Sequence, residues 1–481
     1  MRETPPAPAS HAAPANGRPS LIVTLVAAAF FMENLDGTII ATALPQMARS
    51  FDVHAVDLSI GITSYLLTLA VFIPISGWAA DRFGVRNVFT AALAVFTASS
   101  VACGMTDGLV EFTAARVVQG IGGAMMVPVG RLAVLRATPK DGLMRAISII
   151  TWPGLVAPVI GPPLGGFITT YSSWRWIFYL NVPLGIIGMV LAWRFIGAET
   201  DKQKRPFDGI GFALCGIAGT AIMYAMELLG RAGAPWREAL AFLAGGLVAG
   251  VAALFHLRRS AHPVVDLSAF RVKTFAVAMG GGSLFRVSIS AVPFLLPLMF
   301  QLGFGMNAFH SGLLTLVVFA GNLSMKLVTT PVMRRFGFRP VLLANGVIAA
   351  LSIAAMSLLT ASTPLVLAAI VLFASGLSRS LQFTAVNTLS FADVPKPQMS
   401  GASTLSSTLT QMTMGMGVAL GAMAMRLSAW LHGHAAQSVT PADFSLAFVL
   451  VALVGLVAIV DVFGLERDAG AHVSGHRRER A

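Results

Sequence analysis

Apolar runs of about twenty residues recur along almost the whole chain and are separated by short polar connections. A run of this length crosses the roughly 30 Å hydrocarbon core of a bilayer as an α-helix, and the alternating pattern of a β-barrel is absent. The pattern therefore predicts an all-α polytopic membrane protein. We expect fourteen spanning helices, near residues 20–44, 58–78, 87–105, 109–130, 144–169, 175–196, 208–229, 238–257, 274–300, 311–332, 340–360, 364–390, 400–426 and 443–464.

Composition supports this class, because 56% of the 481 residues are hydrophobic and only 11% are charged. A soluble globule carries roughly one quarter charged residues. The first apolar run holds Glu33 and Asp36, so we interpret it as a spanning helix and not as a cleaved signal peptide. Cys103 and Cys215 both lie in apolar runs, which indicates neither a disulfide framework nor a metal site.

The chain has a net charge of +12, and its Lys and Arg residues lie in alternate connections between the apolar runs. They are not interleaved with aromatic residues, as they would be on a nucleic-acid surface. Connections 301–310 and 361–364 hold no Lys or Arg, so the positive-inside rule predicts that both termini are cytoplasmic. The basic residues of the other connections are Arg82, Arg86, Arg131, Arg136, Lys140, Arg145, Arg194, Lys202, Lys204, Arg205, Arg258, Arg259, Arg271, Lys273, Arg334, Arg335, Arg339, Lys396, Arg477, Arg478 and Arg480.

A short internal repeat divides the chain. The sequence RFGVR at 82–86 follows the second expected helix, and RFGFR at 335–339 follows the tenth. This spacing favours two six-helix halves related by duplication, with helices seven and eight inserted between them. We therefore predict the following parts: a disordered cytoplasmic tail (1–19), an N-terminal bundle (20–196), an inserted helix pair with linkers (197–273), a C-terminal bundle (274–464) and a basic cytoplasmic tail (465–481).

Ionisable residues inside apolar spans are the first functional candidates, because burying one costs about 2.5 to 3.5 kcal/mol on insertion scales. Glu33 and Asp36 are three apart on the first helix and should share one face, where two carboxylates resist ionising together. At least one is expected to carry a proton, although a structural hydrogen bond or a solvated helix end would also fit. Arg116 in the fourth helix requires a carboxylate or carbonyl partner from a neighbouring helix.

In the second half, the charged residues inside the spans are positive, since Arg286, Lys326 and Arg379 lie in spans without an acid. We expect either a positive cavity for an anionic or zwitterionic solute group or pairing with Glu33, Asp36 or Glu227. The polar residues expected in such a cavity are Asn322, Gln382, Asn387 and Gln411. Glu227 lies near a helix end and is expected to be solvated.

Two glycine-containing segments complete the candidates. The fifth span has glycine and proline where helix formers are expected, so it should bend and pack closely, either for helix packing alone or for transport. Its candidates are Gly154, Pro158, Gly161, Pro162, Pro163, Gly165 and Gly166. The polar turn after the second span can lock one conformation or be a plain solvated turn. Its candidates are Gly77, Asp81, Arg82, Gly84 and Arg86.

Five motifs together resemble the fourteen-helix drug:proton antiporters of the major facilitator superfamily. They are LDGTIIATALP (35–45), GWAADRFGVR (77–86), RVVQGIGGA (116–124), GLVAPVIGPPLGG (154–166) and WRWIFYLNVPLG (174–185). Later stretches, such as PFLLPLMFQLGFG and QFTAVNTLSFADVP, are similar to the MdtD and HsrA branch.

The resemblance implies an inner-membrane secondary exporter that works by alternating access, with a small-molecule substrate leaving as protons enter. It links Asp36 to coupling, Arg116 to proton transfer, the 77–86 turn to gating and the fifth helix to antiport. Glu33 is outside the shared pattern, and Arg334 stands where an acid would mirror Asp81.

Several alternatives stay open. The substrate is expected to be a drug-like molecule, an organic anion or a metal chelate of an organic acid, and a facilitator without coupling is a further alternative. A membrane enzyme is disfavoured because His11, His54, His256, His432 and His434 lie in tails and connections. No GxxxxGK[ST] loop occurs, so we expect a proton gradient as the energy source, no cofactor and no bound metal.

Overall fold

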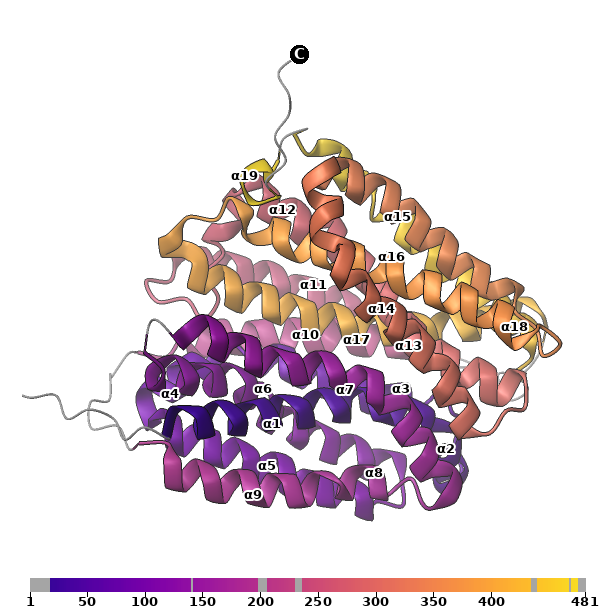
Figure 1. Cartoon of the computed structure of the whole chain (residues 1–481), viewed down its shortest axis with the longest axis horizontal. Helices are drawn as coiled ribbons and strands as arrows, with labels where there is room; N and C mark the ends of the chain where they lie inside the picture. Colours follow the sequence, from indigo (N-terminus) through magenta and orange to yellow (C-terminus); the bar gives the residue numbers. More distant parts are fainter. Residues whose placement is uncertain are drawn as a thin grey trace, which may run out of the picture.

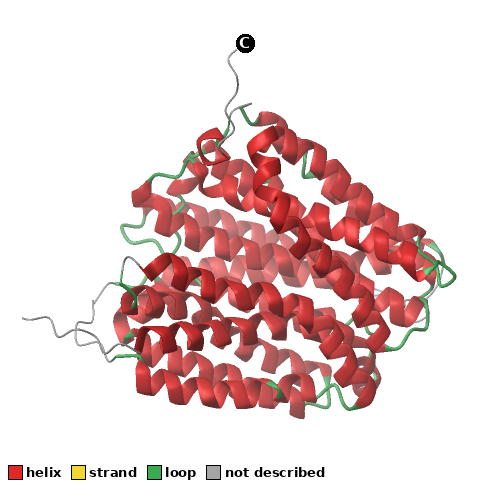
Figure 2. Cartoon of the chain, viewed as in Figure 1, coloured by secondary structure: helices red, strands yellow, loops and turns green. Residues whose placement is uncertain are grey.

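The computed structural model describes residues 18–139, 142–197, 206–229, 236–433, 439–466 and 469–474, and its elements in these ranges are helices without a strand (Figure 2). Thirteen of the described helices are long and apolar enough to cross a membrane, or up to fourteen if one bent pair counts as a span. The all-α polytopic fold is therefore confirmed. The first helix begins at Arg18, and the remainder of the expected 1–19 tail lies outside the described residues.

The N-terminal bundle lies in the lower part of Figure 1. Its elements are α1 (Arg18–Ile39), η1 (Ile40–Thr42), α2 (Leu44–Phe51), α3 (Ser59–Phe72), α4 (Ile75–Phe83), α5 (Val85–Met105), α6 (Leu109–Ala137), α7 (Leu143–Tyr171), α8 (Trp176–Tyr179) and α9 (Asn181–Phe195). Helices α3 and α4 form the second span and are bent by 58°. The bend lies at Pro74, because proline has no N–H to continue the helix and its ring clashes with the preceding turn.

The C-terminal bundle occupies the upper part of Figure 1. Its elements are η3 (Ser268–Arg271), α12 (Lys273–Met279), α13 (Gly281–Leu298), η4 (Met299–Gly303), α14 (Ala308–Phe336), α15 (Phe338–Ala355), η5 (Met356–Leu358), α16 (Leu365–Ala392), η6 (Lys396–Gln398), α17 (Met399–Leu431), α18 (Pro441–Val457), η7 (Val460–Gly464) and α19 (Ala471–Ser474). The short α19 lies in the segment expected as a basic tail. Residues 467, 468 and 475–481 of that tail lie outside the described ranges.

The two RFG turns adopt corresponding conformations in the two bundles. Gly84 joins α4 to α5 with φ +88°, and Gly337 joins α14 to α15 with φ +75°. Glycine reaches this left-handed region at no steric cost, so the turn needs it at both places. The equivalent positions agree with two related halves.

The inserted helices α10 (Gly209–Leu229) and α11 (Trp236–Arg259) pack against each other, and α10 contacts both bundles. A Cβ at Gly219 of α10 would lie 3.3 Å from Leu67 of α3 and 4.0 Å from Met412 of α17. The expectation that Glu227 is solvated is wrong, because its side chain is buried and accepts a hydrogen bond from Ser59 of the N-terminal bundle. The neighbouring helices cover this helix end.

Asp208, directly before α10, anchors the chain that leaves α11. Its carboxylate accepts hydrogen bonds from the backbone of Gly211 and Val264, and the His256 ring lies 2.7 Å away. Burial raises the pKa of Asp208, but these hydrogen bonds outweigh burial and hold the pKa below its ordinary value. The contacts tie both ends of the inserted pair to one carboxylate.

The two bundles meet closely at the end of the molecule that carries α2, which we call the α2 end (Figure 1). Gln301 donates to the Thr42 carbonyl at 3.1 Å, the Phe309 N–H donates to Thr170 at 3.1 Å, and Arg426 pairs with Asp57. Each of these contacts joins the N-terminal bundle to the C-terminal bundle. The opposite end, which carries the RFG turns, we call the basic end.

Gly122→Ala is expected to destabilise the N-terminal bundle by about 1–3 kcal/mol, because the added methyl overpacks the α5–α6 contact. A Cβ there would lie 2.7 Å from the Phe96 nitrogen and 2.9 Å from the Ala92 carbonyl oxygen, and both are backbone atoms of α5. Thermal unfolding in detergent measures the change. The control is Gly245→Ala on α11, where a Cβ meets nothing within 4 Å. Equal midpoints for the two variants would contradict this packing.

Candidate functional site

A fully buried ion pair links α1 to α6. The Arg116 Nη1 atom lies 2.6 Å from Asp36 Oδ2, and both side chains are 0% exposed. Arg116 also donates to the Gly61 carbonyl of α3 at 3.3 Å, and its guanidinium lies 4.1 Å above the Tyr65 ring. The carboxylate and the carbonyl are the kinds of partner that the sequence predicted for Arg116.

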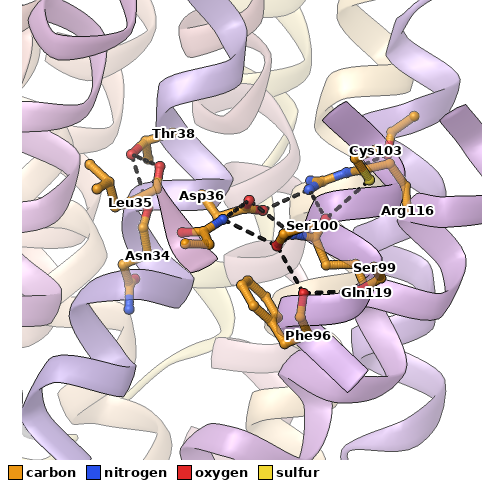
Figure 3. Close-up of polar contacts among 12 residues, drawn as sticks. Asn34, Leu35, Asp36, Thr38, Phe96, Ser99, Ser100, Cys103, Arg116 and Gln119 are labelled. Atoms are coloured by element: carbon orange, nitrogen blue, oxygen red, sulfur yellow. Dashed lines mark hydrogen bonds and ion pairs between the residues drawn. The ribbon is translucent and has the colours of Figure 1, made fainter. Parts of the chain in front are cut away.

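Neutral polar side chains complete the surroundings of Asp36 (Figure 3). Its Oδ1 atom accepts hydrogen bonds from Gln119 at 3.0 Å and from Asn181 of α9 at 2.9 Å. Both amides also donate to the Ser100 hydroxyl of α5, at 2.8 and 3.3 Å. The network fixes the carboxylate between α1, α5, α6 and α9. Because hydrogen bonds and a cation surround the charged form, a buried carboxylate is tolerated there.

Glu33 and Asp36 face different surroundings, in contrast to the shared face expected from their spacing. Residues three apart on a helix are neighbours but differ in direction by about 60°. This is enough for Asp36 to enter the α5–α6 network while Glu33 lines a cavity between the bundles. The two acids are therefore neighbours on α1, but Asp36 enters the buried network and Glu33 lines the cavity.

The central cavity has a volume of about 220 Å³ and is lined by both bundles. The N-terminal bundle contributes Glu33 and Tyr65, and the C-terminal bundle contributes Arg379, Gln411 and an apolar wall. The apolar lining includes Leu69, Pro158, Pro162, Phe294, Phe319 and Met414. Asn34, Thr38, Ser290 and Thr315 add neutral polar groups, and a mainly apolar surface with polar groups set in it is typical of a small-molecule site.

Only part of the expected positive cavity is present. Of the seven candidates, Arg379 and Gln411 line the central cavity, whereas Arg286 is buried within the C-terminal bundle and donates to Asn387 at 2.7 Å. Gln382 is hydrogen-bonded inside the same bundle to Asn345 and the Leu342 carbonyl. Lys326 is exposed and donates to Thr384, and Asn322 is half-buried on α14. The prediction of one cavity shared by all seven residues is therefore wrong, and it holds for Arg379 and Gln411 alone.

The glycines and prolines of α7 serve two interfaces. Gly154, Gly161 and Gly165 face Asn34, Thr38 and Thr42 of the first span. Gly166 and Pro162 face α14, where a Cβ on Gly166 or Gly312 would overlap the opposite backbone. Pro158 and Pro162 also line the cavity. The helix thus packs closely, as predicted, and forms part of both the bundle interface and the cavity wall.

The polar turn contacts its own bundle. Asp81 pairs with Arg136 of α6 at 3.3 Å, and the Arg86 guanidinium lies 4.4 Å above the Trp193 ring of α9. Gly77 and Arg82 are exposed. The Asp81 pair is partly exposed, so its contribution is small in this conformation.

Sequence reasoning did not assign a role to Tyr65, Ser100 or Asn181. Asn181 lies within the WRWIFYLNVPLG motif, and Gln119 lies within RVVQGIGGA. A polar residue inside an apolar motif is the sequence feature that could have identified Asn181 as a site residue. Tyr65 and Ser100 carried no comparable signal, because single hydroxyl groups are common in spanning helices.

Two helical bundles, an inserted pair and a cavity with a buried ion pair beside it define a multi-pass membrane transporter of the two-bundle class. The model of the Major Facilitator Superfamily matches residues 26–418, and the chain belongs to this superfamily. The MdtD multidrug resistance protein of Pectobacterium atrosepticum is 37% identical over 437 residues, which cover 91% of this chain and 94% of the relative. MdtD of Klebsiella pneumoniae is 37% identical over 462 residues, which cover 95% and 97%.

Solved structures share the fold at lower identity. The crystal structure of a D-xylose-proton symporter matches with a TM-score of 0.66 at 14% identity, over 94% of this chain and 99% of that chain. An auto-inhibited peptide transporter of the POT family matches with a TM-score of 0.65 at 15% identity, over 96% and 98%. The predicted resemblance to MdtD-like drug:proton antiporters is confirmed at the family level. The family and these relatives also make the chain a transporter and not an enzyme.

Proposed function

We propose that the protein is a proton-coupled exporter of small molecules of the multidrug type, driven by a proton gradient. The observation that carries the proposal is the buried Asp36–Arg116 pair, whose guanidinium stacks on Tyr65 of the cavity lining. Protonation of Asp36 would remove one charge of the pair and free Arg116 to change partners. A group that binds and releases a proton next to a solute cavity is what coupling requires.

Alternating access is the proposed mechanism. In this structure the bundles are joined at the α2 end, through α7 with α14 and through Asp57 with Arg426. Export requires this end to open while the basic end closes. We assign gating at the basic end to the turn with Asp81 and Arg136, and antiport to the close packing of α7.

The proposed location is a bacterial inner membrane with the basic end and both termini in the cytoplasm, since positive connections stay on that side. A pH difference of one unit across the membrane supplies about 1.4 kcal/mol per proton, and a membrane potential of 100 mV adds roughly 2.3 kcal/mol per charge moved. One proton can therefore sustain a several-hundredfold solute gradient. An organic anion or a metal chelate of an organic acid is the second candidate substrate, because Arg379 places a cation in the cavity wall.

The test is proton release from acid-loaded proteoliposomes when candidate drugs or organic anions are added. The native protein is expected to release protons with at least one solute, and Asp36→Asn is expected to give no release, because an amide cannot carry the proton. Asp107→Asn is the control, since this acid is 86% exposed and remote from the cavity. Solute flux without proton movement in the native protein would contradict coupling and favour a facilitator.

A further inference from the structure

The central cavity holds one acid and one base on opposite bundles. Glu33 projects from α1 of the N-terminal bundle, and Arg379 projects from α16 of the C-terminal bundle. Among the described residues no ion pair joins Glu33 to Arg379. The Glu33 carboxyl oxygens and the Arg379 guanidinium nitrogens therefore lie more than 4 Å apart in the cavity lining. The cavity therefore presents a carboxyl group from one bundle and a guanidinium group from the other.

Each of the two side chains has a polar atom that is buried without a hydrogen-bond partner in the described structure. These atoms are Glu33 Oε2 and Arg379 Nη1, and the Tyr65 hydroxyl beside them is in the same state. Glu33 is 9% exposed and Tyr65 is 2% exposed. A buried donor or acceptor without a partner is costly, so a solute that offers matching polar groups would be stabilised here.

The rest of the lining combines apolar side chains with the neutral polar residues Asn34, Thr38, Ser290 and Thr315. Phe294, Phe319 and Leu69 line the same cavity, and its volume of about 220 Å³ is below the roughly 300–1,000 Å³ of drug-sized pockets. The cavity in this conformation therefore fits a compact molecule with an apolar ring between its polar ends.

We infer that the cavity binds a compact zwitterion, with its ammonium group on Glu33, its carboxylate on Arg379 and its apolar body between the aromatic side chains. A solute with one charge leaves either Glu33 or Arg379 without a partner. The inference deepens the proposed function by naming the substrate class, and it rests on that function only in treating the cavity as the solute site.

Three probes on one scaffold test the inference by equilibrium binding to the purified protein in nanodiscs at neutral pH. The zwitterion is 4-(aminomethyl)benzoate, the cation is 4-methylbenzylamine and the anion is 4-methylbenzoate. The zwitterion is expected to bind on the order of tenfold more tightly than either of the others, because it alone satisfies both charged groups. Equal binding of the three probes would overturn the inference.

Two charge-removing variants assign the two ends. Glu33→Gln is expected to abolish the preference for the zwitterion over 4-methylbenzoate, while the preference over 4-methylbenzylamine remains. Arg379→Gln should do the reverse. Each variant must still discriminate one pair of probes, so selective loss cannot come from misfolding.

Matched controls lie outside the cavity. Glu227→Gln removes a buried acid on α10, and Lys326→Gln removes an exposed cation on α14, so neither is expected to change the preferences. Proton release with other solutes, but no preference for the zwitterion, would overturn the inference and leave the proposed function standing. A clear preference with no proton release by any solute would overturn the coupling and leave the binding site standing.

Discussion

Arg116→Met is expected to destabilise the protein by about 3–5 kcal/mol, because it leaves the Asp36 carboxylate buried without its cation. Gln119 and Asn181 still donate to Asp36, but neutral amides do not balance a charge in a medium of low dielectric constant. The measurement is thermal or denaturant unfolding in detergent. The control is Asp107→Asn, which breaks an ion pair with an exposed acid and should cost at most about 1 kcal/mol.

The double variant Asp36→Asn with Arg116→Met separates stability from transport. It removes both buried charges, so most of the lost stability is expected to return, whereas proton release stays absent. A double-mutant cycle gives the interaction between the two residues. If the double variant were as unstable as Arg116→Met alone, the loss would come from packing around the arginine side chain and not from an uncompensated charge.

Gly312→Val is expected to stop transport while leaving the protein folded. A Cβ at Gly312 would overlap the Pro162 carbonyl oxygen and lie 3.0 Å from Pro163 Cα, both backbone atoms of α7. Backbone in a packed helix cannot yield, so the added side chain separates the bundles at the α2 end. Neither bundle's interior changes, so the fold should survive. Gly245→Val on α11 is the control, because space there is open.

The separation can be measured with Ala308→Cys, because Ala308 is only 7% exposed and its carbonyl oxygen faces Gly166 of α7 across the closed α2 end. Cys215 is replaced by serine in this background, and Cys103 is buried. Labelling by an impermeant thiol reagent is expected to be on the order of tenfold faster in Gly312→Val, as a penalty of 1–3 kcal/mol on closure implies. Unchanged labelling together with native transport would show that the contact at Gly312 does not control closure.

The local pattern of the chain determined the helices and their equivalence. Apolar length decides whether a segment spans a bilayer, and every backbone group inside must be satisfied within its own helix, so both conditions can be read from consecutive residues. The glycines of the RFG turns are equally local, since positive φ at Gly84 and Gly337 follows from the residue type. The requirement of Arg116 for a partner was also evident, because a buried cation needs one.

Only the tertiary structure decided which groups share a site. Glu33 and Asp36 are close in sequence, yet one lines the cavity and the other joins a network with α6 and α9. Arg286 and Arg379 are both cations in apolar spans, yet only Arg379 reaches the cavity. The surroundings of a side chain depend on helices that lie far away in the sequence. Hydrophobic patterning does not determine how each helix is rotated relative to those neighbours. The need of Arg116 for a partner follows from residue chemistry, whereas the choice of Asp36 and the cavity lined by Glu33 and Arg379 follow from how the helices pack.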